Sequence, residues 1–389
     1  MSLLLTNIGE LTTHTEEHGT LHDAAVVIED GRIAWVGPAD RAPAADTHDD
    51  LDGRAVLPGW VDSHTHLVSM GDRAEEFIDR MAGRPYEAGG IMRTVEATRA
   101  ATDDDLRARA RWLRAEAYSG GTTTIEAKTG YGLDVETEQR LARISAEHAE
   151  VVTYLGAHVV PAGVDRRAYI DLVTGPMLAA VAPYATYIDV FCEQGAFDVE
   201  ESREILEAGR AAGLGVKLHG NQLGESGGVQ LAVEMGATSV DHCNHLSPKD
   251  VEALAGSNTV ATLLPACDLS TREPFPPARE LVDAGVTIAI ASNCNPGSSF
   301  TTSMGFCVAT AVLQQRLTFE EALWAATVGG ATALGLDDSA GRITEGGPAD
   351  LHALGAPSAK HLAYRPGVPL THKVWKRGAS MFTRSNFSG

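Results

Sequence analysis

The sequence predicts an α/β protein: a (β/α)8 barrel of the TIM type with a small β-sandwich domain built from both termini. The middle of the chain alternates buried strand-like runs with amphipathic segments, which is typical of parallel βα units. Eight such runs occur, the number that closes a barrel. Both ends of the chain carry short β signals instead. We therefore expect a small domain from residues 1–54 and 340–389, and a metal-dependent barrel from residues 55–339.

The terminal β signals come first and last along the chain. Residues 24–37 contain two strand-like runs joined at Asp30 and Gly31, a dipeptide that favours a tight hairpin. Residues 349–354 and 371–378 have the same character near the other end. Their similarity indicates one sheet that is shared by the two termini.

The barrel elements follow in order. The predicted strands are residues 55–66, 122–128, 151–158, 187–192, 215–219, 239–242, 260–264 and 287–291. Helix starts are marked by a capping residue with a carboxylate three positions later: Thr102 with Asp105, Asp198 with Glu201, Ser247 with Asp250, and Thr318 with Glu321. In such a barrel the chemistry takes place at the C-terminal ends of the strands.

The composition limits the partners. A net charge of −21 disfavours nucleic acid and anionic membranes, and an anionic substrate would need a local cation. The chain has no apolar run of the ~18 residues that span a bilayer, and its first residues do not resemble a signal peptide, so we expect a cytoplasmic protein. Its five cysteines never occur as CxxC, which indicates reduced thiols and no structural zinc site.

Two histidines end the first predicted barrel strand. His64 and His66 are two residues apart, so in an extended strand their imidazoles project to the same side. Two imidazoles that converge at the end of a buried strand indicate a metal site. A pair of core histidines with satisfied hydrogen bonds would give the same local pattern.

Other strand ends carry histidines too. His158, His219 and His242 end the third, fifth and sixth predicted strands, and a shared site explains this placement most simply. The eighth strand is followed by the polar turn 293–298, and the second by the glycine-containing segment 128–132.

These motifs resemble the amidohydrolase superfamily, and more closely its imidazolonepropionase family. The resemblance rests on the HTH sequence and on five further segments: residues 71–77, 120–133, 156–158, 189–193 and 295–298. It implies hydrolysis of 4-imidazolone-5-propanoate to N-formimidoyl-L-glutamate in histidine degradation. It also implies one zinc or iron ion per chain and a homodimer.

The resemblance also implies roles for individual residues. The metal ligands would be His64, His66 and His219, with Asn293 after strand eight completing the set. The residues that contact substrate would be Arg73, Tyr131, His158, Gln222, Asn295, Gly297 and Ser298. Arg73 can grip the propanoate carboxylate with two parallel hydrogen bonds, and it supplies the cation that this acidic chain must provide locally. Without the resemblance, a solvated loop arginine would be the simpler reading.

Asn293 departs from the family pattern, in which an aspartate binds metal and accepts a proton from water. An amide oxygen can coordinate a metal but cannot act as a base. We expect His242 to serve as the base, with Asp268 as the second candidate. Gln222 also stands where some relatives have a carboxylate, so it would orient the substrate.

Two further points concern carboxylates and rival functions. Glu126 and Lys128 alternate to one face of the second strand, so we expect them to pair inside the barrel. Glu193 stands where two-metal relatives place a bridging ligand, but no lysine ends that strand, which favours a single ion. The alternatives to the main reading are another metal-dependent amidohydrolase or deaminase acting on a small nitrogen heterocycle, and a non-catalytic binding paralogue.

Overall fold

The structure is a computed structural model that describes residues 1–83 and 90–384. Its internal contacts divide the chain into two units. The first unit comprises Met1–Asp62, Ala115–Thr124 and Ser303–Gly389, and the second comprises Ser63–Arg114 and Ile125–Thr302. The domain limits given above, 1–54 with 340–389 and 55–339, stay a prediction.

A seven-stranded sheet combines the two ends of the chain, which confirms the β domain. Its strands are β1 (Ser2–Thr12), β2 (Thr20–Glu29), β3 (Arg32–Pro38), β4 (Thr47–Pro58), β13 (Leu351–Leu354), β14 (Thr371–Lys376) and β15 (Ala379–Thr383). They lie in the order β15-β14-β13-β4-β1-β2-β3, with β1 and β4 parallel and the other pairs antiparallel. Asp30 and Gly31 both have positive φ angles, 49° and 78°, and form the predicted hairpin between β2 and β3.

The second sheet has eight strands in sequential order, which confirms the (β/α)8 prediction. The strands are β5 (Trp60–Asp62), β6 (Thr122–Lys128), β7 (Val151–Ala157), β8 (Tyr187–Cys192), β9 (Gly215–Gly220), β10 (Ser239–His242), β11 (Val260–Leu263) and β12 (Ile288–Ile290). A parallel bridge between Thr65 and Cys294 joins the segments that follow the first and last strands. There the amide of Asn293 donates to the carbonyl of His64 at 2.9 Å, so closure places the turn after β12 beside the two histidines.

The first predicted barrel strand, 55–66, is wrong in extent. Its first part, Ala55–Pro58, is the end of β4 and pairs with β13 in the terminal sheet, and only Trp60–Asp62 belongs to the barrel. The chain changes sheets at Gly59, where an added Cβ would lie 2.2 Å from the Thr123 side chain. Both parts are buried, so the hydrophobic pattern runs through the break without a signal.

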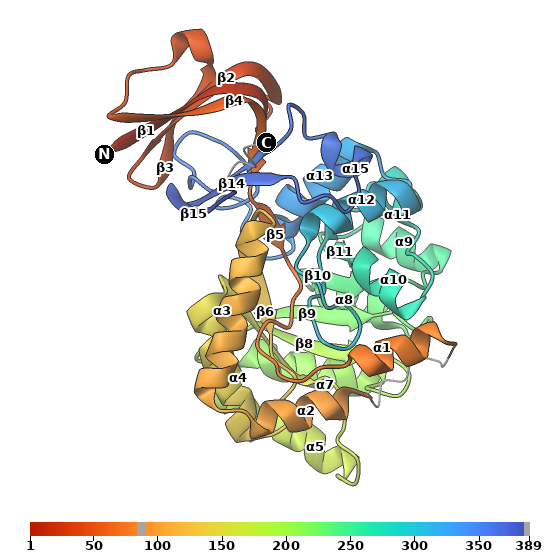
Figure 1. The fold of residues 1–389 in the computed structure, drawn as a ribbon. Coiled ribbons are helices and arrows are strands. Elements are labelled where there is room, and N and C mark those ends of the chain that lie inside the picture. The colour runs from red at the N-terminus through yellow and green to blue at the C-terminus, as the bar shows by residue number, and fades with distance from the viewer. Residues whose placement is uncertain (84–89, 385–389) are drawn as a thin grey trace. The chain divides into compact units, whose positions relative to one another are not determined.

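Helices fill most of the connections (Figure 1). They are α1 (Ala74–Met81), α2 (Ile91–Ala100), α3 (Asp103–Ser119), α4 (Val135–His148), α5 (Arg166–Leu172), α6 (Leu178–Val181), α7 (Val199–Ala211), α8 (Gly228–Glu234), α9 (Pro248–Ala255), α10 (Pro265–Thr271), α11 (Ala278–Asp283), α12 (Met304–Gln314), α13 (Phe319–Trp324), α14 (Gly330–Thr332) and α15 (His361–Tyr364). Short turns of other helix types are η1 (Ala39–Arg41), η3 (Val173–Met177) and η4 (Ala325–Gly329).

The predicted helix starts are confirmed. Complete capping boxes begin α7, α9 and α13, and at the start of α3 the side chains of Thr102 and Asp105 each accept a hydrogen bond from the other residue's backbone amide. Each box satisfies backbone N–H groups that a helix start would otherwise leave without a partner. These bonds fix the residue at which each of these helices begins.

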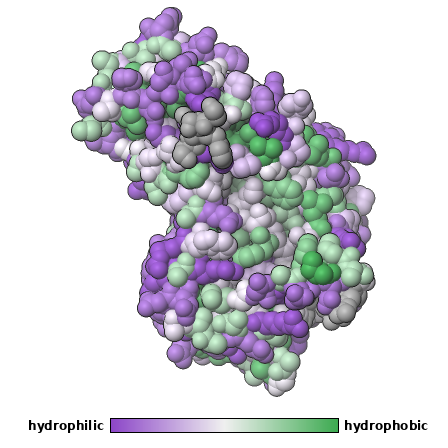
Figure 2. Space-filling model, in the orientation of Figure 1, coloured by the Kyte–Doolittle hydropathy of each residue, from purple (hydrophilic) through white to green (hydrophobic). Residues whose placement is uncertain are grey.

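Hydrophilic residues cover much of the face seen in Figure 2, with hydrophobic residues in small groups between them. Within the described residues, every helix is too short or too polar to cross a lipid bilayer.

Candidate active site

Five histidines meet at one end of the barrel strands, as their positions in the sequence predicted. The ring centroids of His64 and His66 are 5.4 Å apart, and those of His64 and His219 are 4.5 Å apart. His242 lies 5.4 Å from His219, and His158 stacks on His66 at 5.5 Å. The side chains thus share a common centre although the first and last of them, His64 and His242, lie 178 positions apart in the sequence.

Two carboxylates orient two of these imidazoles. Nδ1 of His64 lies 2.7 Å from Oδ2 of Asp241, and Nδ1 of His219 lies 3.0 Å from Oδ1 of Asp189. An ionised carboxylate can only accept, so each Nδ1 carries the hydrogen and donates it. In the neutral ring the lone pair is then on Nε2, the nitrogen that remains for a metal.

These roles of Asp189 and Asp241 were not predicted from the sequence. A usable signal was present for Asp189, because the other residues of its strand are buried and largely apolar, whereas Asp241 stands between a valine and a histidine in a short buried strand. A carboxylate at such a position needs a buried partner. Asp189 belongs to the family segment 189–193, but its neighbours in the sequence do not specify its partner.

The electrostatics keep His64 neutral and its carboxylate partner charged. Burial, and then the positive charge of Lys128, lower the pKa of His64 to about 3. Burial alone would raise the pKa of Asp241, but Lys128 and Lys217 hold that pKa well below its usual range. Around neutral pH, His64 therefore offers a lone pair rather than a second proton.

The donor set fits a divalent metal ion. Within the described part of the chain, four buried imidazole nitrogens of this cluster have no hydrogen-bond partner: Nε2 of His64, Nδ1 of His66, Nε2 of His219 and Nδ1 of His242. Buried polar atoms without a partner are rare, and several imidazoles that point to one place are a typical metal site.

The geometry selects a triplet of histidines that differs in one member from the three predicted histidine ligands. Nitrogens of His64, His219 and His242 all lie within 4.8 Å of one another. His66 lies in the same cluster but is not a member of this triplet. The roles of His66 as ligand and of His242 as base stay predictions. The metal content of the single variants distinguishes a ligand from a base.

Asn293 borders the cluster. It has a positive φ angle of 53°, and its side-chain Oδ1 accepts a hydrogen bond of 3.0 Å from Nδ2 of Asn295. Asparagine tolerates this left-handed conformation better than most residues. The amide is therefore held in place beside the histidines, where its oxygen can contribute to a metal site.

A pocket of about 560 Å³, which includes the space at its mouth, opens beside the histidines. Its lining includes six of the seven predicted substrate residues: Arg73, Tyr131, His158, Gln222, Asn295 and Ser298. Its other lining residues are His66, Ile91, Val159, Phe191, Ala196, His219, His242 and Asn293. Gly297, the seventh predicted substrate residue, packs against Arg73: a Cβ added at Gly297 would lie 2.2 Å from Nη1 of the arginine.

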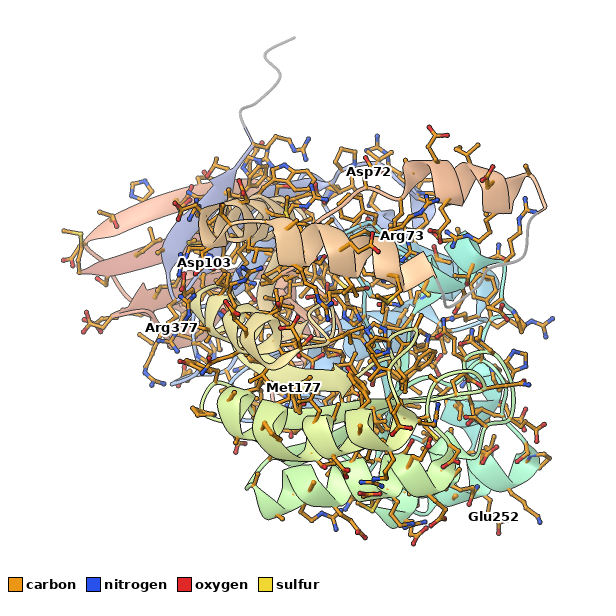
Figure 3. All side chains as sticks on the ribbon, turned by 90° about the horizontal axis from the view of Figure 1, so that it is seen from below. Asp72, Arg73, Asp103, Met177, Glu252 and Arg377 are labelled. Atoms are coloured by element: carbon orange, nitrogen blue, oxygen red, sulfur yellow. The ribbon has the colours of Figure 1, made fainter. Side chains whose placement is uncertain are left out.

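Arg73 brings a positive charge to this pocket. It precedes α1, where Figure 3 labels it, and only 5% of its surface is exposed. Its Nε donates to Glu76 at 2.9 Å, and a terminal nitrogen donates to the other oxygen of the same carboxylate. This fork fixes the plane of the guanidinium at the pocket wall.

The side chain of Asn295 shapes the turn that contains Gly297 and Ser298. Its Oδ1 accepts from both of their backbone amides, at 2.8 and 2.9 Å, and its Nδ2 donates to the hydroxyl of Ser298. These bonds form an Asx-type turn. Asn295 therefore acts on the shape of the pocket whether or not it also contacts a substrate.

Asp268, the second candidate for the base, lies apart from the described pocket lining. It sits on α10, is buried, and accepts a hydrogen bond of 2.7 Å from Asn244. Burial raises its pKa well above the usual range. The structure brings His242, but not Asp268, to the pocket wall.

Two carboxylates anticipated in the sequence have defined partners. Glu126 and Lys128 pair at 3.0 Å inside the barrel, as predicted. Glu193 accepts hydrogen bonds from the amides of Gln222 and Leu223, at 2.9 and 3.0 Å. It therefore holds the loop that carries Gln222 to the pocket.

Glu138 on α4 holds the loop of Tyr131 in a similar way. Its carboxylate accepts from the backbone amides of Gly130, Gly132 and Leu133, at 3.0, 2.6 and 3.0 Å. We expect Glu138→Ala to lower the free energy of unfolding by about 3 kcal/mol, because it leaves buried N–H groups unsatisfied. Denaturant unfolding measures this. Glu136→Ala, on the exposed side of the same helix, should change the unfolding free energy by less than about 0.5 kcal/mol.

The barrel, the buried histidine cluster and its carboxylate partners define a metal-dependent hydrolase of the amidohydrolase class. The sequence profile described as amidohydrolase family matches residues 55–379, and the chain belongs to this family. Solved structures of the same fold include 5-methylcytosine deaminase from Klebsiella pneumoniae, with a TM-score of 0.79, 16% identity and coverage of 99% of both chains. Another is an adenosine deaminase from Xanthomonas campestris with bound zinc, with a TM-score of 0.74, 19% identity and coverage of 98% of this chain and 93% of that one.

Within the family, the curated relatives are more specific. A protein named imidazolonepropionase from Saccharopolyspora erythraea is 61% identical over 98% of this chain and 100% of its own length. One of the same name from an Arthrobacter species is also 61% identical, over 97% of this chain and 99% of its own. The resemblance to the imidazolonepropionase family found in the motifs therefore extends over nearly the whole chain.

Proposed function

We propose that this chain is a hydrolase that opens the ring of 4-imidazolone-5-propanoate to give N-formimidoyl-L-glutamate, a step of histidine degradation. The observation that supports this substrate is the 61% identity to a relative named imidazolonepropionase over 98% of the chain. The pocket supports this substrate, because a buried arginine and imidazoles with nitrogens that are unpaired within the described chain line the same cavity.

The proposed cofactor is a single zinc or iron ion held by histidines of the cluster, with Asn293 beside them. When bound, such an ion supplies a Lewis acid that polarises the ring and makes water a stronger acid near neutral pH. Three neutral imidazoles and a neutral amide would leave most of the ion's positive charge uncompensated, which strengthens both effects. The substitution of an amide for the usual carboxylate is thus compatible with hydrolysis.

The chain's own residues bind and orient the substrate. Arg73 would hold the propanoate carboxylate with its fixed guanidinium. Tyr131 and His158 lie within 5.4 Å of each other, centroid to centroid, and line the wall where they can contact the ring. Gln222 can donate to a substrate oxygen but cannot move a proton.

A proton carrier is still required, because Asn293 cannot accept a proton from water. His242 fits best: it lines the pocket, and its buried Nδ1, which has no partner within the described residues, can accept a proton when the other histidines of the cluster hold the metal. We propose that His242 takes a proton from water and delivers it to the ring nitrogen that leaves the carbon under attack. Asp268 is not among the described residues that line the pocket, so it is the weaker candidate.

The test combines metal analysis with the ultraviolet absorbance of the imidazolone ring. Purified protein should contain about one equivalent of zinc or iron and should consume imidazolone propanoate, with loss of its chromophore. Asn293→Ala should lower the metal content, and His242→Ala should lower turnover while metal is retained. Loss of metal in His242→Ala together with normal metal content in His66→Ala would mean that His242, and not His66, is a metal ligand.

Two results would reject the proposal. Turnover of a neutral nitrogen heterocycle with no turnover of imidazolone propanoate would indicate a different amidohydrolase or deaminase. A chain that binds imidazolone propanoate without consuming it, at full metal occupancy, would be a binding paralogue. The homodimer and the cytoplasmic location also stay predictions.

A further inference from the structure

A group of buried charges lies inside the barrel next to the histidine cluster. Its members come from four strands and are fully buried: Glu126 and Lys128 from β6, Asp189 from β8, Lys217 from β9, and Asp241 from β10. Removing five charges from water costs several kcal/mol for each ion. The opposite charges compensate one another, which explains why they can be buried together. It does not explain why they lie next to the histidine cluster.

Lys128 makes the contacts that link this group to the site. Its Nζ lies 2.8 Å from Oδ2 of Asp189 and 3.2 Å from Oδ2 of Asp241. These are the two carboxylates that accept from His219 and His64. One ammonium group therefore joins the partners of two imidazoles that come from different strands.

Lys217 is equally buried but makes different contacts. Its Nζ lies 2.8 Å from Oε1 of Glu126 and 3.2 Å from the carbonyl oxygen of Ser63. Across residues 1–83 and 90–384, no ion pair within 4.0 Å joins Lys217 to Asp189 or Asp241. It offers a control with the same charge and the same burial.

We propose that Lys128 is a positioning residue for the metal centre. It fixes Asp189 and Asp241 so that they hold His219 and His64 with Nε2 directed to the common point. This inference rests on the proposed function, because it assumes that the cluster binds a metal ion. Carboxylates that orient metal-binding histidines commonly affect metal affinity by about 10–100-fold, and Lys128 would act on two of them together.

Simple electrostatics predicts the opposite effect, which makes the proposal testable. Removing a positive charge near a cation site should strengthen cation binding if charge alone matters. If Lys128 positions the carboxylates, its removal should weaken metal binding, because the imidazoles lose their fixed orientation. The sign of the change therefore separates the two explanations.

The experiment measures zinc affinity of the full-length metal-free protein by competition with a chromophoric chelator. We expect Lys128→Met to bind zinc about 10–100-fold more weakly than the wild type. Lys217→Met should bind zinc within about 3-fold of the wild type. Thermal unfolding of both variants should show that each loses stability, because each removes a buried positive charge that compensates neighbouring buried carboxylates.

The proposal is overturned if Lys128→Met binds zinc as tightly as the wild type or more tightly, or if both variants weaken binding equally. If Lys128→Met does not fold, Lys128→Gln removes the charge but keeps polar atoms near the carboxylates, and the same criteria apply. Failure of the function itself looks different: the wild type would then bind no zinc or consume no imidazolone propanoate.

Discussion

Replacing His64 with alanine is expected to produce a protein that folds but retains almost no metal and no hydrolase activity. The variant removes an imidazole whose Nε2 has no other partner, and it leaves Asp241 without the ring that it orients. Loss of an outer partner of a metal-binding histidine already costs about 10–100-fold in affinity, so loss of the histidine should cost at least about 100-fold. Metal analysis after gel filtration, with turnover on the same sample, measures both effects.

His352 provides the matched control. It is a fully buried histidine in the terminal sheet, where Nε2 lies 3.0 Å from the Thr371 hydroxyl. His352→Ala should lower the melting temperature through the lost packing but leave metal content per folded molecule unchanged. Equal metal loss in the two variants would mean that the effect reflects unfolding rather than coordination.

The second large effect is expected at Arg73. Arg73→Met should raise KM for imidazolone propanoate by about 100-fold or more, because two charge-assisted hydrogen bonds to the carboxylate would be lost. Steady-state kinetics with the chromophore assay measures KM and kcat separately. We expect kcat to fall less than KM rises, since the carboxylate lies outside the ring that reacts.

Two comparisons sharpen this prediction. Arg93→Met, at an exposed position on α2, should leave KM unchanged. The propanamide analogue of the substrate has no negative charge, so the wild type and Arg73→Met should process it at similar rates. An unchanged KM in Arg73→Met would mean that another residue binds the carboxylate and that Arg73 serves only to pair with Glu76.

Sequence reasoning located the barrel because its signals are local. Seven of the eight strands lie within a residue or so of their predicted positions, since a buried strand followed by a capped helix is visible in a short window. The histidines were found for the same reason. The fold rule that places strand ends together allowed residues as distant as His64 and His242 to be assigned to one site.

The predictions from the sequence fail where a structural feature depends on residues that are distant in the sequence. The break at Gly59 is invisible, because one buried run serves two sheets and only the approach of Thr123 requires a glycine there. The roles of Asp189 and Asp241 depend on which imidazole stands opposite, and neighbouring residues in the sequence do not specify that.

The amino-acid sequence by itself determined the class of fold, the histidines that gather at the strand ends, and the family to which the chain belongs. Only the tertiary structure decided which carboxylate orients which ring, that Lys128 joins both carboxylates, and that Asp268 stays away from the pocket. The reason is physical: strand propensity and helix capping act between near neighbours, whereas a hydrogen bond inside a barrel depends on distances that exist only once the sheet has closed.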